Sequence, residues 1–170
     1  MKKVLIVYYS LANGNTYQIA RRLQQVVGGD LARIETVQPY TGSYDDIVAQ
    51  GQREVDEGYC PEITEPSVSL ANYDVIALGT PTWWYTMAPA MRSFLVQHDF
   101  QGKMVIPFST NGGWSGHVNQ DMAKLAKGAA SRCPLAVTFD VAGTGTIEQS
   151  TPALTEWLRQ VRNLVTDSAL

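Results

Sequence analysis

Cysteine is scarce in this sequence. The 170 residues include only Cys60 and Cys133, which lie far apart and form no CxxC pair. That spacing supports neither a metal site nor a redox-active disulfide. We therefore expect no bound metal and a reduced, cytoplasmic protein.

The sequence also lacks a large excess of charge and a long hydrophobic run. Lys and Arg number 13 against 16 Asp and Glu, the net charge is −3, and no basic cluster occurs. We therefore expect no nucleic-acid or membrane partner. The apolar run at 4–9 follows two lysines, but it is shorter than the core of a signal peptide and far shorter than a membrane span.

The bulk composition is that of a folded domain. Apolar residues make up 45% of the chain and charged residues 17%, which is typical of a globular protein. No linker, internal repeat or low-complexity tract interrupts the sequence. Residues 1–170 are accordingly predicted to form one domain.

Short apolar runs predict the strands. Runs that are apolar on both faces are typical of parallel strands covered by helices above and below. Pro107 has no backbone N–H to donate, so we expect a bulge or a strand end there. The alternating segment 31–37 predicts an edge strand. The predicted buried strands are 3–9, 73–79, 104–109 and 134–143.

Apolar residues at helical spacing lie between these runs, and the alternation predicts an α/β doubly wound sheet. Pro89 suits a first helical turn, Thr151 suits an N-cap and Pro152 the first position after it. In the long connection 38–72, Ser43 is the expected cap of a further helix. The predicted stripes are Ile19/Leu23/Val26/Val27, Met91/Phe94/Leu95, Val118/Met122/Leu125/Ala126, Leu154/Trp157/Leu158/Val161/Val165 and Tyr44/Ile47/Val48/Val55.

Ligands of open parallel sheets bind beyond the carboxyl ends of the strands. The first loop at that edge, SLANGNT at 10–16, offers hydroxyl and amide groups and one glycine before a helix N-terminus. Such a helix start binds anions. The loop has no Lys or Arg and fits neither GxxxxGK[ST] nor GxGxxG. A monoester phosphate is the ligand this loop favours; a simple N-cap turn is the alternative.

The second loop contains three consecutive aromatic residues, Trp83, Trp84 and Tyr85, directly after a buried strand. Turns at such positions normally hold small polar residues. Large exposed rings need a partner to cover. The rings are expected either to pack on the protein's own core or a subunit interface, or to stack on a planar ligand.

The third loop, STNGGWSGH at 109–117, is rich in glycine and precedes a helix. Glycines let the backbone approach a ligand closely. His117 suggests an acid or base, but no carboxylate is recognised at a spacing that would work with it, so a surface role is favoured. Together, the three loops suit a planar ring system that carries a phosphate, such as flavin mononucleotide (FMN).

The three segments, in this order and spacing, resemble the flavodoxin family. VLIVYYSLANGNTYQIA is similar to the family's first strand and phosphate loop, YDVIALGTPTWWYTMAPAMRSFL to its second flavin loop and KMVIPFSTNGGWSGH to its third. The connection at 38–63 resembles that of a subgroup of bacterial flavodoxin-like proteins. The resemblance implies a short-chain type, three-layer sandwich with a five-stranded parallel sheet of order 2-1-3-4-5.

The resemblance also implies which residues hold FMN. The sequence departs from the family pattern in two ways. Its phosphate loop has one residue more than the family's common form, and its flavin loops are nearly neutral, whereas the strictest flavodoxins carry acidic residues around the flavin. The implied FMN contacts are Ser10, Leu11, Asn13, Gly14, Asn15 and Thr16 for the phosphate, Pro81, Thr82, Trp83 and Trp84 for the ring and ribityl chain, and Thr110, Asn111, Gly112, Gly113 and Trp114 for the pyrimidine edge and the other ring face.

Two functions follow from the resemblance. The first is a monomeric electron carrier that passes single electrons between redox partner proteins, a reductase and an acceptor. The second is an FMN-dependent NAD(P)H:quinone-type oxidoreductase, which is expected to be a dimer. A flavin-binding or sensory module is the third possibility.

Overall fold

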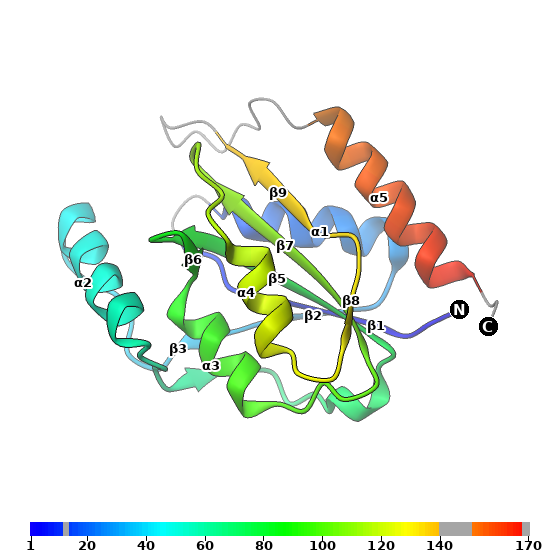
Figure 1. Cartoon of the computed structure of the whole chain (residues 1–170), viewed down its shortest axis with the longest axis horizontal. Helices are drawn as coiled ribbons and strands as arrows, with labels where there is room; N and C mark the ends of the chain where they lie inside the picture. Colours follow the sequence, from blue (N-terminus) through cyan, green and yellow to red (C-terminus); the bar gives the residue numbers. More distant parts are fainter. Residues whose placement is uncertain (12–13, 140–150, 168–170) are drawn as a thin grey trace.

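The computed structural model describes residues 1–11, 14–139 and 151–167 (Figure 1). A twisted sheet runs through the centre, with strands in the order β2-β1-β5-β7-β8, and β9 also pairs with β7. All of these strands are parallel. They are β1 (Val4–Tyr8), β2 (Asp30–Arg33), β5 (Val75–Trp83), β7 (Met104–Asn111), β8 (Ala130–Ser131) and β9 (Leu135–Thr138).

Counting β8 and β9 as two pieces of one strand, the predicted order 2-1-3-4-5 and the α/β doubly wound class are confirmed. Two short antiparallel pairs complete the strands: β6 (Thr86–Met87) with the end of β5, and β3 (Glu35–Thr36) with β4 (Ile63–Thr64). A 3-10 helix, η1 (Leu70–Asn72), precedes β5.

Helices cover both faces of the sheet (Figure 1). On one face, α1 (Asn15–Val27) and α5 (Thr151–Thr166) pack on strand residues such as Ile6 and Ala77. On the other, α3 (Pro89–Gln97) and α4 (Val118–Leu125) pack on Leu5 and Leu78. Because neighbouring strand residues point to opposite faces, two cores require strands that are apolar throughout. None of the helices in the described ranges is long and apolar enough to cross a membrane.

The prediction of a bulge or strand end at Pro107 was wrong, because β7 runs unbroken from Met104 to Asn111 and Leu78 pairs with Pro107 in register. The carbonyls of Val105 and Asn111 face the outer neighbour, since they accept from Arg132 and Phe139. Pro107 shares that orientation by the period of two. The missing N–H therefore faces residues 132–134, where β8 has ended and β9 has not begun, so it costs no ladder bond.

Three other boundaries differ from the sequence expectation. The edge strand predicted at 31–37 is divided into β2 and β3, which pair with different strands. The last strand begins with β8, which was not predicted, and of the range 134–143 only 134–139 lies within the described residues. Helix α5 begins at Thr151 itself, so Pro152 is its second residue rather than its first.

Helix α2 (Tyr44–Glu57) lies outside the two layers, beyond the end of the sheet (Figure 1). Its start follows the prediction: the Ser43 hydroxyl accepts from the Asp46 N–H, and the Asp46 carboxylate accepts from the Ser43 N–H. This capping box satisfies two otherwise unpaired donors. The predicted apolar face is only thinly covered, because Tyr44 is 81% exposed and Gly51 is the buried residue of the helix.

Candidate functional site

The first loop leaves the start of α1 open. Gly14 stands at the N-cap with a left-handed φ of 67°, and no side-chain cap is found among the residues that the structure describes. This finding argues against the simple N-cap turn. Tyr17 N–H reaches only the Ser10 hydroxyl, at 3.4 Å. A helix start with uncapped N–H groups, aided by its dipole, is a site for an anion.

Within the described part of the first loop, the buried Asn15 Oδ1 has no hydrogen-bond partner. Buried amide oxygens are normally paired, and this one requires a donor such as a hydroxyl group. Leu11 is half-buried and packs against the α3/α4 core, whereas Asn13 lies outside the described residues.

A buried hydroxyl pair joins the first loop to the third. Thr16 Oγ1 and Thr110 Oγ1 lie 2.8 Å apart, and both residues are buried. Thr110 is at the carboxyl end of β7 and Thr16 is in the first turn of α1. Two segments nearly one hundred positions apart in the sequence are therefore held at one edge of the sheet.

One cation beside the first loop was missed from the sequence. The Arg33 guanidinium donates to the Ser10 carbonyl at 3.3 Å and forms an ion pair with Glu35. Burial raises the pKa of the Tyr8 phenol, and the nearby Arg33 guanidinium partly opposes this rise. Arg33 ends β2, the strand beside β1, so strand order was the signal that could have found it.

Trp83 in the second loop packs into the protein. Its ring meets those of Tyr9 and Tyr40 edge-on, with centroids 6.0 and 5.0 Å away. Gly51 of α2 is so close that a Cβ there would lie 3.2 Å from the Trp83 ring. Tyr40 is anchored by its hydrogen bond to Glu54, and burial and that bond raise the pKa of the Tyr40 phenol. Trp83 thus packs on the protein, which is one of the two roles considered for these rings, and it is only partly buried.

Trp84 and Tyr85 form the turn between β5 and β6, with φ values of 48° and 70°. Two-residue hairpin turns of this kind normally use Asn and Gly, because positive φ costs a bulky residue about 1–2 kcal/mol. The Trp84 indole N–H donates to the Val48 carbonyl of α2 at 3.0 Å. Such strain persists only where surrounding contacts hold it.

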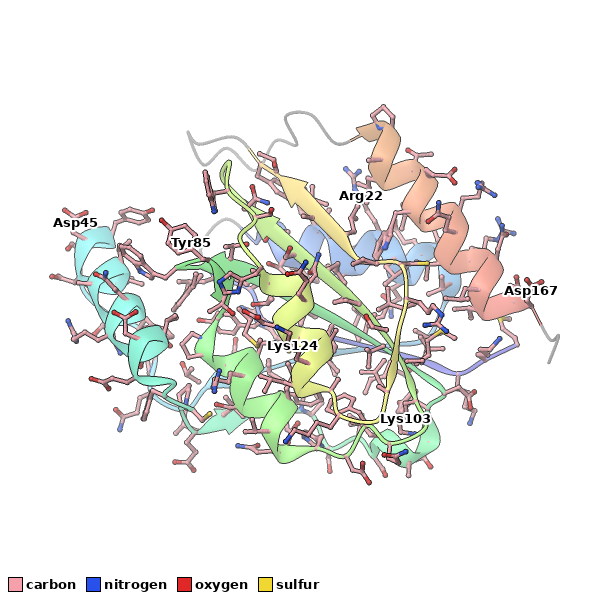
Figure 2. The ribbon with its side chains drawn as sticks, viewed as in Figure 1. Arg22, Asp45, Tyr85, Lys103, Lys124 and Asp167 are labelled. Carbon is pink, nitrogen blue, oxygen red and sulfur yellow. The ribbon has the colours of Figure 1, made fainter. Side chains whose placement is uncertain are left out.

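Tyr85 projects from the hairpin on the side of the molecule that carries α2 (Figure 2). It is 52% exposed, and its ring meets the edge of Trp114, which is 69% exposed, at 6.0 Å between centroids. The exposed aromatic pair at this edge is thus Tyr85 with Trp114, one ring from each loop. Tyr85 was one of the three rings considered for stacking on a planar ligand, but it was not among the FMN contacts implied by the family resemblance.

The second and third loops are tied together. Thr82 Oγ1 donates to the Ser115 carbonyl and the His117 N–H to the Tyr85 carbonyl. Gly116, at φ 58°, lies against the Tyr85 backbone, where a Cβ would come within 2.2 Å of the carbonyl oxygen. Only glycine fits this contact.

His117 does have a carboxylate partner, contrary to the sequence expectation. Asp121, one helical turn later, accepts from the Thr86 hydroxyl at 2.6 Å and contacts His117 Nδ1 through the same oxygen. This i, i+4 spacing on α4 was visible in the sequence, but the helix had to begin beside His117 for it to matter. The arrangement braces the hairpin against α4.

The remaining predicted residues occupy this edge as well. Asn111 Oδ1 accepts from the Gly113 N–H at 2.9 Å, which holds the turn of the third loop. Gly112 and Gly113 are exposed, and a Cβ at either would meet no atom within 4 Å. Pro81 ends the pairing of β5 with β7, directly beside Thr110.

An apolar cavity of about 510 Å³ separates α2 from the second loop. Ile47 and Val48 of α2 form one wall, and Leu11, Thr82 and Trp84 lie on the other. Its size is within the range of small-molecule sites, about 300–1,000 Å³. The edge as a whole thus combines an anion site, exposed aromatic rings and an apolar recess.

The sequence matches the family model named Flavodoxin over residues 3–160. This chain belongs to the flavodoxin family. The fold agrees: a flavoprotein from Lactobacillus acidophilus in complex with FMN has a TM-score of 0.69 at 22% identity, covering 80% of this chain and 93% of that one. A Bacteroides eggerthii protein assigned to the flavoproteins has a TM-score of 0.74 at 26% identity, covering 95% and 98%.

A curated relative carries an enzyme name. The NAD(P)H dehydrogenase (quinone) of Chromohalobacter salexigens is 35% identical over 105 residues, which are 55% of this chain and 46% of that protein. The matched region thus spans less than half the length of this relative.

Proposed function

We propose that this flavodoxin-family chain binds FMN and passes electrons singly between redox partner proteins. The observation that carries the proposal is the Thr16–Thr110 hydroxyl contact of 2.8 Å, which brings the phosphate loop and the third loop to one sheet edge. Family membership supports the cofactor. Bound there, FMN supplies reversible one- and two-electron chemistry, while the chain supplies binding, orientation and the local field.

The residues of this chain fit such a group. Ser10, Gly14, Asn15 and Thr16 would hold the phosphate with neutral donors at the start of α1, with Arg33 as the nearby cation. The unpaired Asn15 Oδ1 requires a donor, and a ribityl hydroxyl of FMN would be a suitable one. Residues 110–114 with Tyr85 would border the ring, and Trp83 and Trp84 hold their loop against α2.

Protein partners are part of this proposal. The third loop is nearly neutral, so docking through a strongly charged surface is not favoured. The exposed rings of Tyr85 and Trp114 offer an apolar contact beside the cofactor instead, since aromatic residues are enriched in interfaces. We propose a monomer that meets its reductase and its acceptor in turn, in the cytoplasm.

The second candidate is an FMN-dependent NAD(P)H:quinone-type oxidoreductase. Two observations favour it: the partial similarity to a protein named NAD(P)H dehydrogenase (quinone), and the apolar cavity between α2 and the second loop, which suits a flat uncharged molecule. Enzymes of this type usually complete their pockets across a dimer, so this function goes with a dimeric chain.

An anaerobic experiment separates the two. The FMN-loaded protein is mixed with NADPH and then NADH, and the visible absorbance of the flavin is followed. For the electron carrier we expect no bleaching within seconds, whereas photochemical reduction proceeds in resolved one-electron steps. Bleaching by either nucleotide would instead support the oxidoreductase, and failure of FMN to bind on titration would overturn both.

A further inference from the structure

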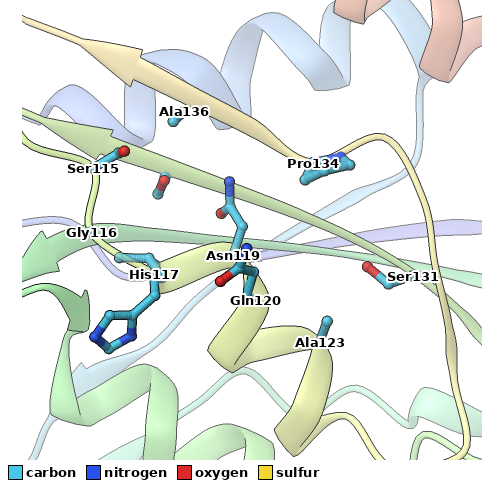
Figure 3. A pocket seen from close by; sticks show the side chains of 11 residues that line it. Ser115, Gly116, His117, Asn119, Gln120, Ala123, Ser131, Pro134 and Ala136 are labelled. Carbon is cyan, nitrogen blue, oxygen red and sulfur yellow. The ribbon is translucent and has the colours of Figure 1, made fainter.

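A second cavity, of about 420 Å³, lies beside α4 at the outer edge of the sheet (Figure 3). Asn119 and Gln120 of α4 form one wall, and Ser131 and Pro134 lie opposite. The cavity exists because the last strand is interrupted at 132–134, where Cys133 takes a left-handed φ of 48°.

The cavity is separate from the phosphate loop. Ser109 and Thr110 are neighbours on β7 and therefore point to opposite faces of the sheet. The Thr110 hydroxyl meets Thr16 of α1, whereas Ser109 lines the cavity on the α4 face. A molecule in this cavity would thus leave the first loop free.

Two of the residues that line the cavity each have a buried polar atom without a partner, just behind the cavity surface. Ser109 is 1% exposed, and within the described ranges its hydroxyl has no hydrogen-bond partner. The buried Asn119 Oδ1 is likewise unpaired there. Asn119 Nδ2 donates to the Leu135 carbonyl at 2.9 Å. Because that carbonyl can only accept, the orientation of the amide is determined and Oδ1 must be an acceptor.

We infer that this cavity is a binding site for a small neutral molecule that presents an N–H donor beside an acceptor, as a carboxamide does. The donor would meet Asn119 Oδ1 and the acceptor would meet the Ser109 hydroxyl, after small side-chain rotations that open both atoms to the cavity. Buried polar groups normally have partners, and here a ligand would supply them.

The lining also selects against ions. Among the lining residues that the structure describes, none is Lys, Arg, Asp or Glu, and the imidazole of His117 is engaged by Asp121. A charged ligand would therefore be desolvated without a counter-ion, which is strongly unfavourable. The volume is within the range of small-molecule sites.

Benzamide and benzoate are matched probes, since they share shape but differ in charge and in the N–H donor. The FMN-loaded, isotopically labelled chain is titrated with each, and amide resonances are followed by NMR. We expect saturable shifts from benzamide around Ser109, Asn119 and Ser131, and none there from benzoate. Equal responses to the two probes, or no saturable response to benzamide, would overturn the inference.

Ser109→Ala is expected to weaken benzamide binding about 3- to 10-fold, the effect of one neutral hydrogen bond. Ser67→Ala, at an exposed position away from the cavity, is the control and should leave the affinity unchanged. A crystal structure of the unmutated protein grown with benzamide provides a second test that does not depend on any variant. Benzamide paired with Asn119 would support the site; ordered water alone at Ser109 and Asn119, or an adventitious additive only, would overturn it.

Discussion

The aromatic rings of the second loop divide into two environments within three residues. On the α2 side, Trp83 is enclosed by Tyr9, Tyr40 and Gly51. Two residues later, at the tip of the hairpin, Tyr85 stands exposed against Trp114. The comparison teaches that Trp83 and Trp84 fasten the loop to α2 while the Tyr85 ring remains available to a ligand. Neighbouring residues of the same chemical type thus have different roles because the turn reverses the chain between them.

The largest expected effect is on the enclosed ring. Trp83→Ala should lower the free energy of unfolding by about 3 kcal/mol, because it leaves a cavity among three packed groups. Trp114→Ala, at an exposed ring, should lower it by less than about 0.5 kcal/mol. Urea unfolding of the apo-protein measures both. Similar losses of unfolding free energy in the two variants would contradict the distinction between a packed and an exposed ring.

The second effect concerns the contact of Gly116 with the Tyr85 backbone, which supports the exposed Tyr85 ring. Gly116→Ala should lower the free energy of unfolding by about 2 kcal/mol, because the new Cβ would meet the Tyr85 carbonyl at a positive φ. Gly112→Ala is the matched control in the same loop, since its Cβ would meet nothing within 4 Å. Thermal unfolding provides the measurement, and a stable Gly116→Ala protein would contradict the bracing of the hairpin.

The third effect concerns the buried hydroxyl pair of Thr16 and Thr110, whose contributions to stability should depend on each other. Thr16→Val or Thr110→Val alone should lower the free energy of unfolding by about 1–2 kcal/mol, because each leaves a buried hydroxyl without its partner. The double variant should lose less than the sum of the two. A double-mutant cycle in urea tests this, and strict additivity would mean that the contact contributes nothing.

The smallest effect is on the helix that covers Trp83. Ser43→Ala removes the N-cap of α2 and should lower the free energy of unfolding by about 1 kcal/mol. The Ser43 hydrogen bonds lower the pKa of Asp46. The stabilisation by the Asp46 carboxylate is therefore fully present above the pKa of this carboxyl in the unfolded chain. It is lost as the pH falls through the lowered pKa of the folded state. Asp46→Asn should remove the part of the acid destabilisation that comes from this carboxyl. Circular dichroism as a function of pH measures it, and an unchanged acid profile in the variant would refute the prediction.

Much of the fold could be predicted because it depends on local patterns. Apolar runs located the buried strands, and Ser43 marked the start of α2. Pro107 was misjudged because its cost depends on the neighbouring strand, which is absent opposite it. Asp121 and Arg33 were missed for the same reason. Their roles arise from contacts with β6 and with Ser10 of the first loop, which lie far from them in sequence.

The sequence by itself determined that three chemically unusual loops follow buried strands, and hence that they gather at one sheet edge. Strand chemistry and parallel order are sufficient for that. Only the tertiary structure decided which rings face outward, which hydroxyls meet and where a second cavity opens. Those outcomes depend on backbone turns such as that at Trp84 and Tyr85, and on contacts between distant segments such as Thr16 and Thr110. A linear pattern carries no record of such contacts, because they form only once helices and sheet are packed.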